Sequence, residues 1–94
     1  MINSYIIIKP NYKDVVTMTL NHLEIGQVGK VTNIDENSAL YQRFLDIGIT
    51  ENSTIECVLK SPWNNPKAYR IKGATIAIRN EDASAIKVDL KREA

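Results

Sequence analysis

Apolar residues in the second half of the chain recur at every other position, which is the period of half-buried β-strands. Two further strands are expected on either side of this part, over the β-branched stretch 26–35 and over residues 86–90. Within 26–35 a bulge at Gly29 would account for a change of phase. The alternation itself predicts three strands, with the inward positions Ile55, Cys57 and Leu59, then Tyr69 and Ile71, then Ile76 and Ile78.

One stretch, residues 39–47, has a helical period instead. Its apolar stripe consists of Leu40, Tyr41, Phe44, Leu45 and Ile47, and Ser38 or Asn37 can cap its start, while Gly48 is expected to end it. At about nine residues this helix is too short to be stable alone, so it must pack on the strands. About five short strands with one helix inserted after the first predict a mainly β fold, a small SH3-like barrel.

The 94 residues amount to one domain, which we place at 18–90. Residues 1–17 form an N-terminal extension outside the pattern, and 91–94 form a solvated tail. Within the extension, residues 5–8 are strand-like and Pro10 interrupts them. This segment is expected to be either an edge strand laid on the domain or a loose tail.

The near-neutral charge argues against a nucleic-acid-coating protein. Lysine and arginine number 12 against 11 aspartates and glutamates, a net charge of +1, whereas nucleic-acid-coating proteins usually carry a clear basic excess. The start of the chain lacks the pattern of a secretory signal, and no apolar run approaches the ~18 residues of a membrane span. A single cysteine permits no internal disulfide. The expected location is the cytoplasm.

Few residues have a pattern that indicates chemistry. His22 and Cys57 are the only histidine and cysteine, and neither belongs to a metal-binding motif. The acidic pairs 35–36 and 81–82 could hold a hard cation weakly, but adjacent acids beside a turn more often serve a helix dipole. No serine has the partners of a nucleophile. We therefore expect no catalytic residue, no metal ligand and no cofactor.

One segment, from Cys57 to Asn80, contains no acidic residue but several cations and aromatic rings. Such a surface could anchor an acidic protein partner, since tryptophan and arginine are favoured at interfaces. It could instead stack on a nucleic-acid strand, or form a solvated hairpin. Its cations and main aromatic residues are Lys60, Lys67, Arg70, Lys72 and Arg79 with Trp63 and Tyr69.

An ordered set of positions in the chain resembles the FeoA family. The closest local match is the run 43–48, Arg-Phe-Leu-Asp-Ile-Gly, which is similar to the family's Arg-Leu-Leu-Glu-Met-Gly element; Phe44 replaces the commoner leucine. The resemblance covers Thr19 to about Leu90, and it leaves residues 1–17 unexplained. The other matching positions are Thr19, Leu20, Leu23, Gly26, Val31, Pro62, Pro66, Gly73, Ala77, Ile78, Arg79, Ala83 and Ile86.

The resemblance implies an SH3-like barrel that acts beside the ferrous iron transporter FeoB in the cytosol, in a family associated with transition metals. The family is also similar to the carboxy-terminal barrel of iron- and manganese-dependent repressors, but this chain lacks their helical DNA-binding region. The expected function is non-enzymatic binding of FeoB, and the alternative is a nucleic-acid-binding module that uses residues 60–79. The residues expected to contact the partner are Arg43, Pro62, Trp63, Pro66, Arg70 and Arg79.

Overall fold

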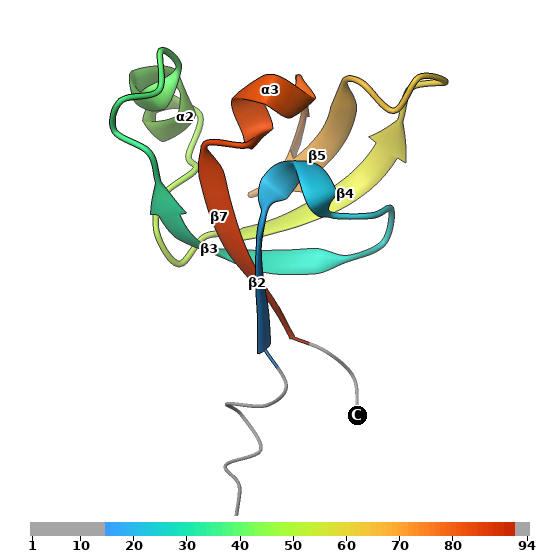
Figure 1. Cartoon of the computed structure of the whole chain (residues 1–94), viewed down its shortest axis with the longest axis horizontal. Helices are drawn as coiled ribbons and strands as arrows, with labels where there is room; N and C mark the ends of the chain where they lie inside the picture. Colours follow the sequence, from blue (N-terminus) through green and yellow to red (C-terminus); the bar gives the residue numbers. More distant parts are fainter. Residues whose placement is uncertain (1–14, 92–94) are drawn as a thin grey trace, which may run out of the picture.

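Six antiparallel strands form one sheet in the computed structural model, which describes residues 15–91 (Figure 1). The mainly β class and the helix inserted after the first predicted strand are confirmed. Residues 5–8, for which we expect either an edge strand or a loose tail, lie outside the described residues. The elements in chain order are β2 (Val15–Thr19), the 3₁₀ turn η1 (Leu20–His22), β3 (Val28–Ile34), α2 (Tyr41–Asp46), β4 (Thr54–Lys60), β5 (Lys67–Ile71), β6 (Ala74–Ile78), α3 (Asn80–Ala83) and β7 (Ile86–Lys91).

The strand order is β2-β7-β3-β4-β5-β6, so β2 and β6 are the two edges of the sheet. β2 is a sixth strand that the alternation did not predict, and it crosses the boundary that we placed after residue 17. Residues 15–17 pair with 89–91 of β7. Their β-branched valines and threonine favour extended backbone, and β7 supplies the hydrogen-bonding partner.

The core combines the inward side chains of the strands with residues from η1, α2 and α3. In Figure 1 the helices lie at one end of the sheet, opposite the end at which β2 begins and β7 finishes. Within residues 15–91 no helix has the length and apolar character to cross a bilayer. The buried apolar side chains are Leu20, Leu23, Val31, Ile34, Phe44, Ile49, Ile55, Cys57, Tyr69, Ile71, Ile78, Ala83, Ile86 and Val88.

The predicted bulge at Gly29 is wrong in position. β3 shifts its register against β7 between Val31 and Asn33, so the extra residue is Thr32, three positions further on. Gly29 has another role: a Cβ placed there would lie 3.0 Å from the Cβ of Val88. The glycine therefore lets β3 and β7 approach closely, and Val31 remains buried after it.

β4 also contains an irregularity, which reverses one predicted position. Its register against β5 shifts between Cys57 and Leu59. Ile55 and Cys57 are buried as expected, but Leu59 is 62% exposed rather than inward. Val58 is the extra residue at the bulge, and after it the side chains of the strand point to the opposite faces. A strict alternation read from the sequence does not predict such a change.

The predicted helix 39–47 is shorter in the structure, where α2 spans Tyr41–Asp46. Its start is delayed because the Ser38 hydroxyl oxygen accepts a hydrogen bond from the Leu40 amide at 3.2 Å, which holds the chain in a turn. Ile47, the last position of the predicted stripe, follows the helix and is 40% exposed.

The expected end of this helix at Gly48 is confirmed. Gly48 has a φ of +99°, in the left-handed region where a glycine carries no steric cost. The chain then turns back, and the Ile49 amide donates to the Phe44 carbonyl at 2.9 Å. Ile49 is fully buried, so the helix is held against the sheet.

Candidate protein-binding surfaces

The loop 61–66 between β4 and β5 displays the most exposed large apolar side chain of the described residues. Trp63 is 86% exposed. The loop is held by its own hydrogen bonds: the Asn64 amide donates to the Ser61 carbonyl at 2.8 Å, and the Asn65 amide donates to the Ser61 hydroxyl at 2.9 Å. The tryptophan therefore projects from an ordered base.

The same loop is tied to the start of α3. The Asn80 amide donates to the side-chain oxygen of Asn65 at 2.9 Å, and the Asn80 side-chain nitrogen donates to the Asn64 carbonyl at 2.9 Å. Arg79 immediately precedes Asn80, so three of the predicted partner residues, Pro62, Trp63 and Pro66, lie on a loop anchored next to a fourth.

The cations and aromatic rings of the segment 57–80 do not form one continuous surface. Lys67 is only 5% exposed, and its ammonium donates to the carbonyls of Asn21 and Leu23. Tyr69 is fully buried, its hydroxyl donates to the Leu20 carbonyl at 3.3 Å, and desolvation raises the pKa of its phenol. Both side chains face inward because alternate residues of β5 form the core. Neither can contact a partner at the surface.

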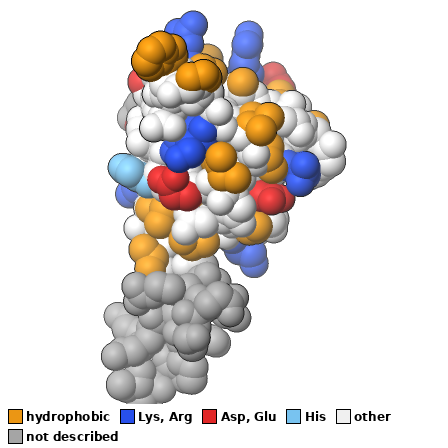
Figure 2. Space-filling view, turned by 90° about the vertical axis from the view of Figure 1, so that its right-hand side faces the viewer, with side chains coloured by type: hydrophobic (Ala, Val, Ile, Leu, Met, Phe, Trp, Pro, Cys, Tyr) orange, Lys and Arg blue, Asp and Glu red, His pale blue; other side chains and the backbone are white. Residues whose placement is uncertain are grey.

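Two further cations of the segment are paired with carboxylates. Lys60 lies 2.8 Å from Glu24, and its hydrogen bond holds the pKa of that carboxyl below the ordinary value. Arg70, a predicted partner contact, lies 3.2 Å from Glu56 on the neighbouring strand. The segment therefore presents less free positive charge than its sequence indicates, and this weakens the nucleic-acid alternative. Figure 2 shows cationic, anionic and hydrophobic side chains interspersed on one face.

Arg43 and Arg79 are brought together by the fold. They line one groove of about 450 Å³ between α2 and β6, and the remaining lining includes Asp82. Among the described residues neither arginine takes part in an ion pair. Sequence reasoning missed this groove, although the apolar stripe of α2 was a signal for part of it. Its apolar lining residues are Leu40, Phe44, Ile47, Ile76, Ala77 and Ile78.

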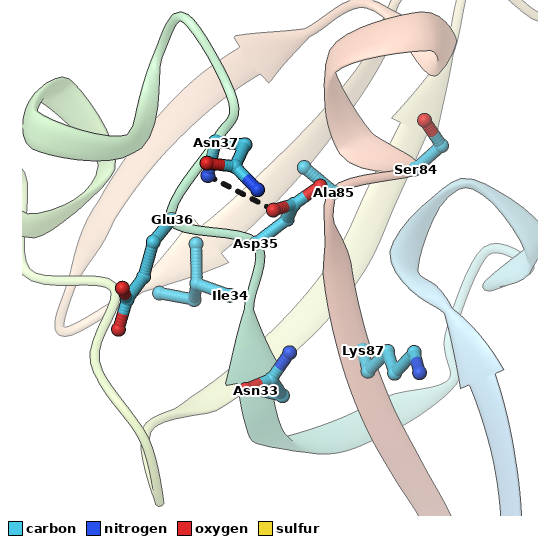
Figure 3. Close-up of a pocket in the computed structure, with 8 residues that line it drawn as sticks. All are labelled: Asn33, Ile34, Asp35, Glu36, Asn37, Ser84, Ala85 and Lys87. Carbon is cyan, nitrogen blue, oxygen red and sulfur yellow. Dashed lines mark hydrogen bonds between the residues drawn. The ribbon is translucent and has the colours of Figure 1, made fainter.

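A second, polar pocket of about 430 Å³ lies where β3 ends and β7 begins (Figure 3). One carboxylate oxygen of Asp35 accepts a hydrogen bond from the Asn37 amide at 2.9 Å, as in an Asx-turn. Glu36 points away from Asp35 in Figure 3, so the two acids do not converge on one point. The other lining residues are Asn33, Ile34, Ser84, Ala85 and Lys87.

The described residues contain no cluster of three or more histidine, cysteine, aspartate or glutamate side chains that could hold a metal ion. The acids Glu81 and Asp82 occupy the first turn of α3, where the helix dipole favours them. This donor set does not fit a resident transition metal, which needs several nitrogen, sulfur or oxygen ligands together.

The cysteine and the histidine do not form an activated pair. Cys57 is buried, and desolvation raises the pKa of its thiol, the opposite of what a nucleophilic thiolate needs. His22 is exposed, and its Nδ1 lies 3.0 Å from the Thr19 hydroxyl.

Comparison with known proteins gives a consistent result. The family model of the FeoA domain matches residues 18–90. A fusion of Fe(2+) transport protein A and the Fe(2+) transporter FeoB from Porphyromonas gingivalis is 30% identical over 73 residues, which are 78% of this chain but 9% of the fusion. A putative Fe(2+) transport protein A from Campylobacter jejuni is 27% identical over 73 residues, 99% of its own length and 78% of this chain.

Solved structures share the fold. A FeoA-like protein from Clostridium acetobutylicum superimposes with a TM-score of 0.77 at 29% identity, covering 83% of this chain and 91% of its own. FeoA from Stenotrophomonas maltophilia, solved with zinc and described as an SH3 domain protein, has a TM-score of 0.70 at 24% identity and covers 82% of this chain and 99% of its own. A manganese-dependent transcriptional repressor matches 79% of this chain and 36% of its own, with a TM-score of 0.71 and 24% identity.

The family model spans all but the first 17 and last four residues, and that part of the chain holds the whole core and every strand except the start of β2 and the last residue of β7. This chain belongs to the FeoA family.

Proposed function

We propose that this protein is a cytosolic, non-enzymatic accessory protein of ferrous iron uptake, and that it acts by binding a FeoB-type transporter. The observation that carries the proposal is the Porphyromonas gingivalis relative, in which the matching domain and the transporter are one polypeptide. A fusion keeps two units permanently close, which raises their effective concentration and is useful when they act on one another.

The Trp63 loop is the proposed docking surface. A tryptophan that is 86% exposed on a hydrogen-bonded loop has a large area to bury and loses little freedom when it does so. Pro62 and Pro66 restrict the same loop further. Arg79 adds a cation next to the loop, and Arg43 adds a second across the groove.

The experiment that tests the proposal is co-purification of the tagged protein from its own cells, with and without the transporter gene. We expect the tagged protein to capture the transporter from the strain that has the gene. From the strain without the gene, the tagged protein should be recovered without membrane material. A preparation with Trp63→Ala serves as the matched control. If the tagged protein is recovered without the transporter from the strain that has the gene, under conditions that keep the membrane protein intact, the proposal is contradicted.

A salt series with single-stranded DNA and RNA tests the alternative class of function. Because Lys67 is buried and Lys60 and Arg70 are paired, we expect no tight binding. Tight binding whose affinity falls steeply with salt would instead favour a nucleic-acid-binding module.

A further inference from the structure

The strand β6 leaves one edge of the sheet open. It is the last strand in the order β2-β7-β3-β4-β5-β6, and within residues 15–91 no strand lies on its other side. The five residues Ala74–Ile78 pair only with β5. An open edge presents unpaired backbone groups to which another extended chain can bind.

The register identifies which backbone groups these are. Ile71 and Ala74 pair across a two-residue turn in which Lys72 and Gly73 have φ angles of 49° and 85°, as expected of a tight hairpin. Residues of an antiparallel pair alternate between those bonded to the partner and those facing away from it. Because Ala74 closes the hairpin and is bonded to β5, the residues whose backbone N–H and C=O groups point away from β5 are Thr75 and Ala77.

The groove described above runs along this same edge. Its floor includes Ile76 and Ile78 of β6, and its other wall is the apolar face of α2 with Phe44 and the partly exposed Ile47. Side chains of an added strand would alternate, and one set of them would face α2. A backbone edge for hydrogen bonds and an apolar wall for side chains therefore lie next to each other.

The charges of the groove select the chemistry of its occupant. Arg43 and Arg79 line it without an ion pair among the described residues, and Asp82 is the one acid of the lining. A second copy that presented its own β6 would offer no complement, because the sequence from Cys57 to Asn80 has no acidic residue. A segment with carboxylates would pair with the arginines, which favour planar, bidentate contacts.

We propose that β6 and the adjoining groove bind an extended, acidic peptide segment of a partner protein, which adds to the sheet as a seventh strand. On the face of this strand that is turned toward α2, its apolar side chains contact α2 and its carboxylates reach Arg43 and Arg79. This site shares Arg43 and Arg79 with the docking surface proposed above but does not include the Trp63 loop. It goes beyond the proposed function, because it requires an extended acidic segment that adds to the sheet, whichever protein carries it.

The test is an NMR titration of the full chain with the blocked seven-residue peptide Glu-Thr-Val-Thr-Val-Thr-Glu, whose glutamates and valines all lie on one face of an extended strand and can face α2 together. We expect saturable binding, with the largest shifts at Thr75 and Ala77. Amide exchange at these two residues should slow at least about tenfold, while that of Ile76, already bonded to β5, stays the same. Shifts centred on the other edge strand, β2, or on the Trp63 loop would overturn the proposal.

Two altered peptides separate strand addition from simple charge attraction. A peptide N-methylated at alternate positions loses the edge hydrogen bonds, and one with lysine in place of glutamate loses the ion pairs. Each should bind at least about tenfold more weakly, since hydrogen bonds to charged groups and edge pairing contribute that much. Equal binding of either altered peptide would overturn the proposal.

Protein variants give an independent readout. Arg79→Glu and Arg43→Glu should each weaken binding of the acidic peptide by about tenfold or more, whereas Lys87→Glu, with the same change of net charge, should change it less than about twofold. Trp63→Ala should leave binding of the peptide unchanged, which separates this site from the Trp63 loop. Equal effects of all the charge variants, or self-association of the free chain in sedimentation, would overturn the proposal.

Discussion

Lys67 illustrates how a residue that looks like part of a basic surface serves the interior instead. Its stem lies in the core on the inward phase of β5, and its ammonium reaches the carbonyls of Asn21 and Leu23. Those carbonyls belong to the chain at and just after η1, where a short 3₁₀ turn leaves acceptors without intrahelical partners. The lysine thus ties η1 to the sheet.

Lys67→Met tests this role. Removing the ammonium leaves two carbonyls without their donor, so we expect the free energy of unfolding to fall by about 2 kcal/mol or more in urea denaturation. Lys72→Met in the exposed turn is the matched control and should change it by less than about 0.5 kcal/mol. Unchanged or higher stability of Lys67→Met would mean that the desolvation cost of the ammonium outweighs its bonds.

Tyr69 gives a pH dependence at the same scale. Desolvation raises the pKa of its phenol in the folded protein. The contribution of the neutral phenol to the free energy of unfolding is therefore complete below the unfolded-state pKa of about 10, and it is lost as the pH rises above that value. Between pH 9 and pH 11 the free energy of unfolding of Tyr69→Phe should fall by about 1 kcal/mol less than that of the natural chain. Cys57 titrates in both proteins and cancels in the difference; equal falls would contradict the assignment.

At the scale of elements, alternation predicted which strands exist but not where they are interrupted. Five predicted strands are present, because each needs only a local period and β-branched residues. The two register shifts depend on what β7 and β5 require of their neighbours, and no local pattern carries that information. For this reason alternation predicts the wrong face for Leu59, and the change of phase predicts a bulge at Gly29 rather than at Thr32.

The crossing of β3 and β7 yields a prediction of its own. Gly29→Ala would place a Cβ 3.0 Å from the Cβ of Val88, so it should cost about 1–3 kcal/mol of stability. The double variant with Val88→Ala should be less destabilised than the sum of the two single changes, by about 1 kcal/mol, because the second change removes the clash. Strict additivity in urea denaturation would show that the two strands do not constrain each other here.

At the scale of the whole molecule, the arrangement of strands decides which candidate residues meet. Arg43 and Arg79 lie 36 positions apart in sequence, yet they line one groove because α2 packs beside β6. Exposure of the Trp63 loop was foreseeable from its two prolines. Burial of Lys67 and pairing of Arg70 with Glu56 were not, because both depend on strand partners.

Metal binding is also a property of the whole arrangement. Because the described residues bring no three metal-ligating side chains together, we expect titration of the monomer with ferrous iron or zinc at neutral pH to give only weak or intermolecular binding. Isothermal titration under anaerobic conditions measures this. A one-to-one site tighter than about micromolar would contradict the expectation.

The central claim concerns the transporter, and titration of a purified FeoB-type transporter in lipid nanodiscs with this protein and with Trp63→Ala tests it most directly. We predict saturable binding that Trp63→Ala weakens at least about tenfold, as expected for the loss of an interface tryptophan. The free energy of unfolding of the Trp63→Ala protein, followed by thermal melting, should differ from that of the natural chain by less than about 1 kcal/mol. Absence of saturable binding would contradict the account. So would a Trp63→Ala protein that melts much earlier but binds equally well per folded molecule.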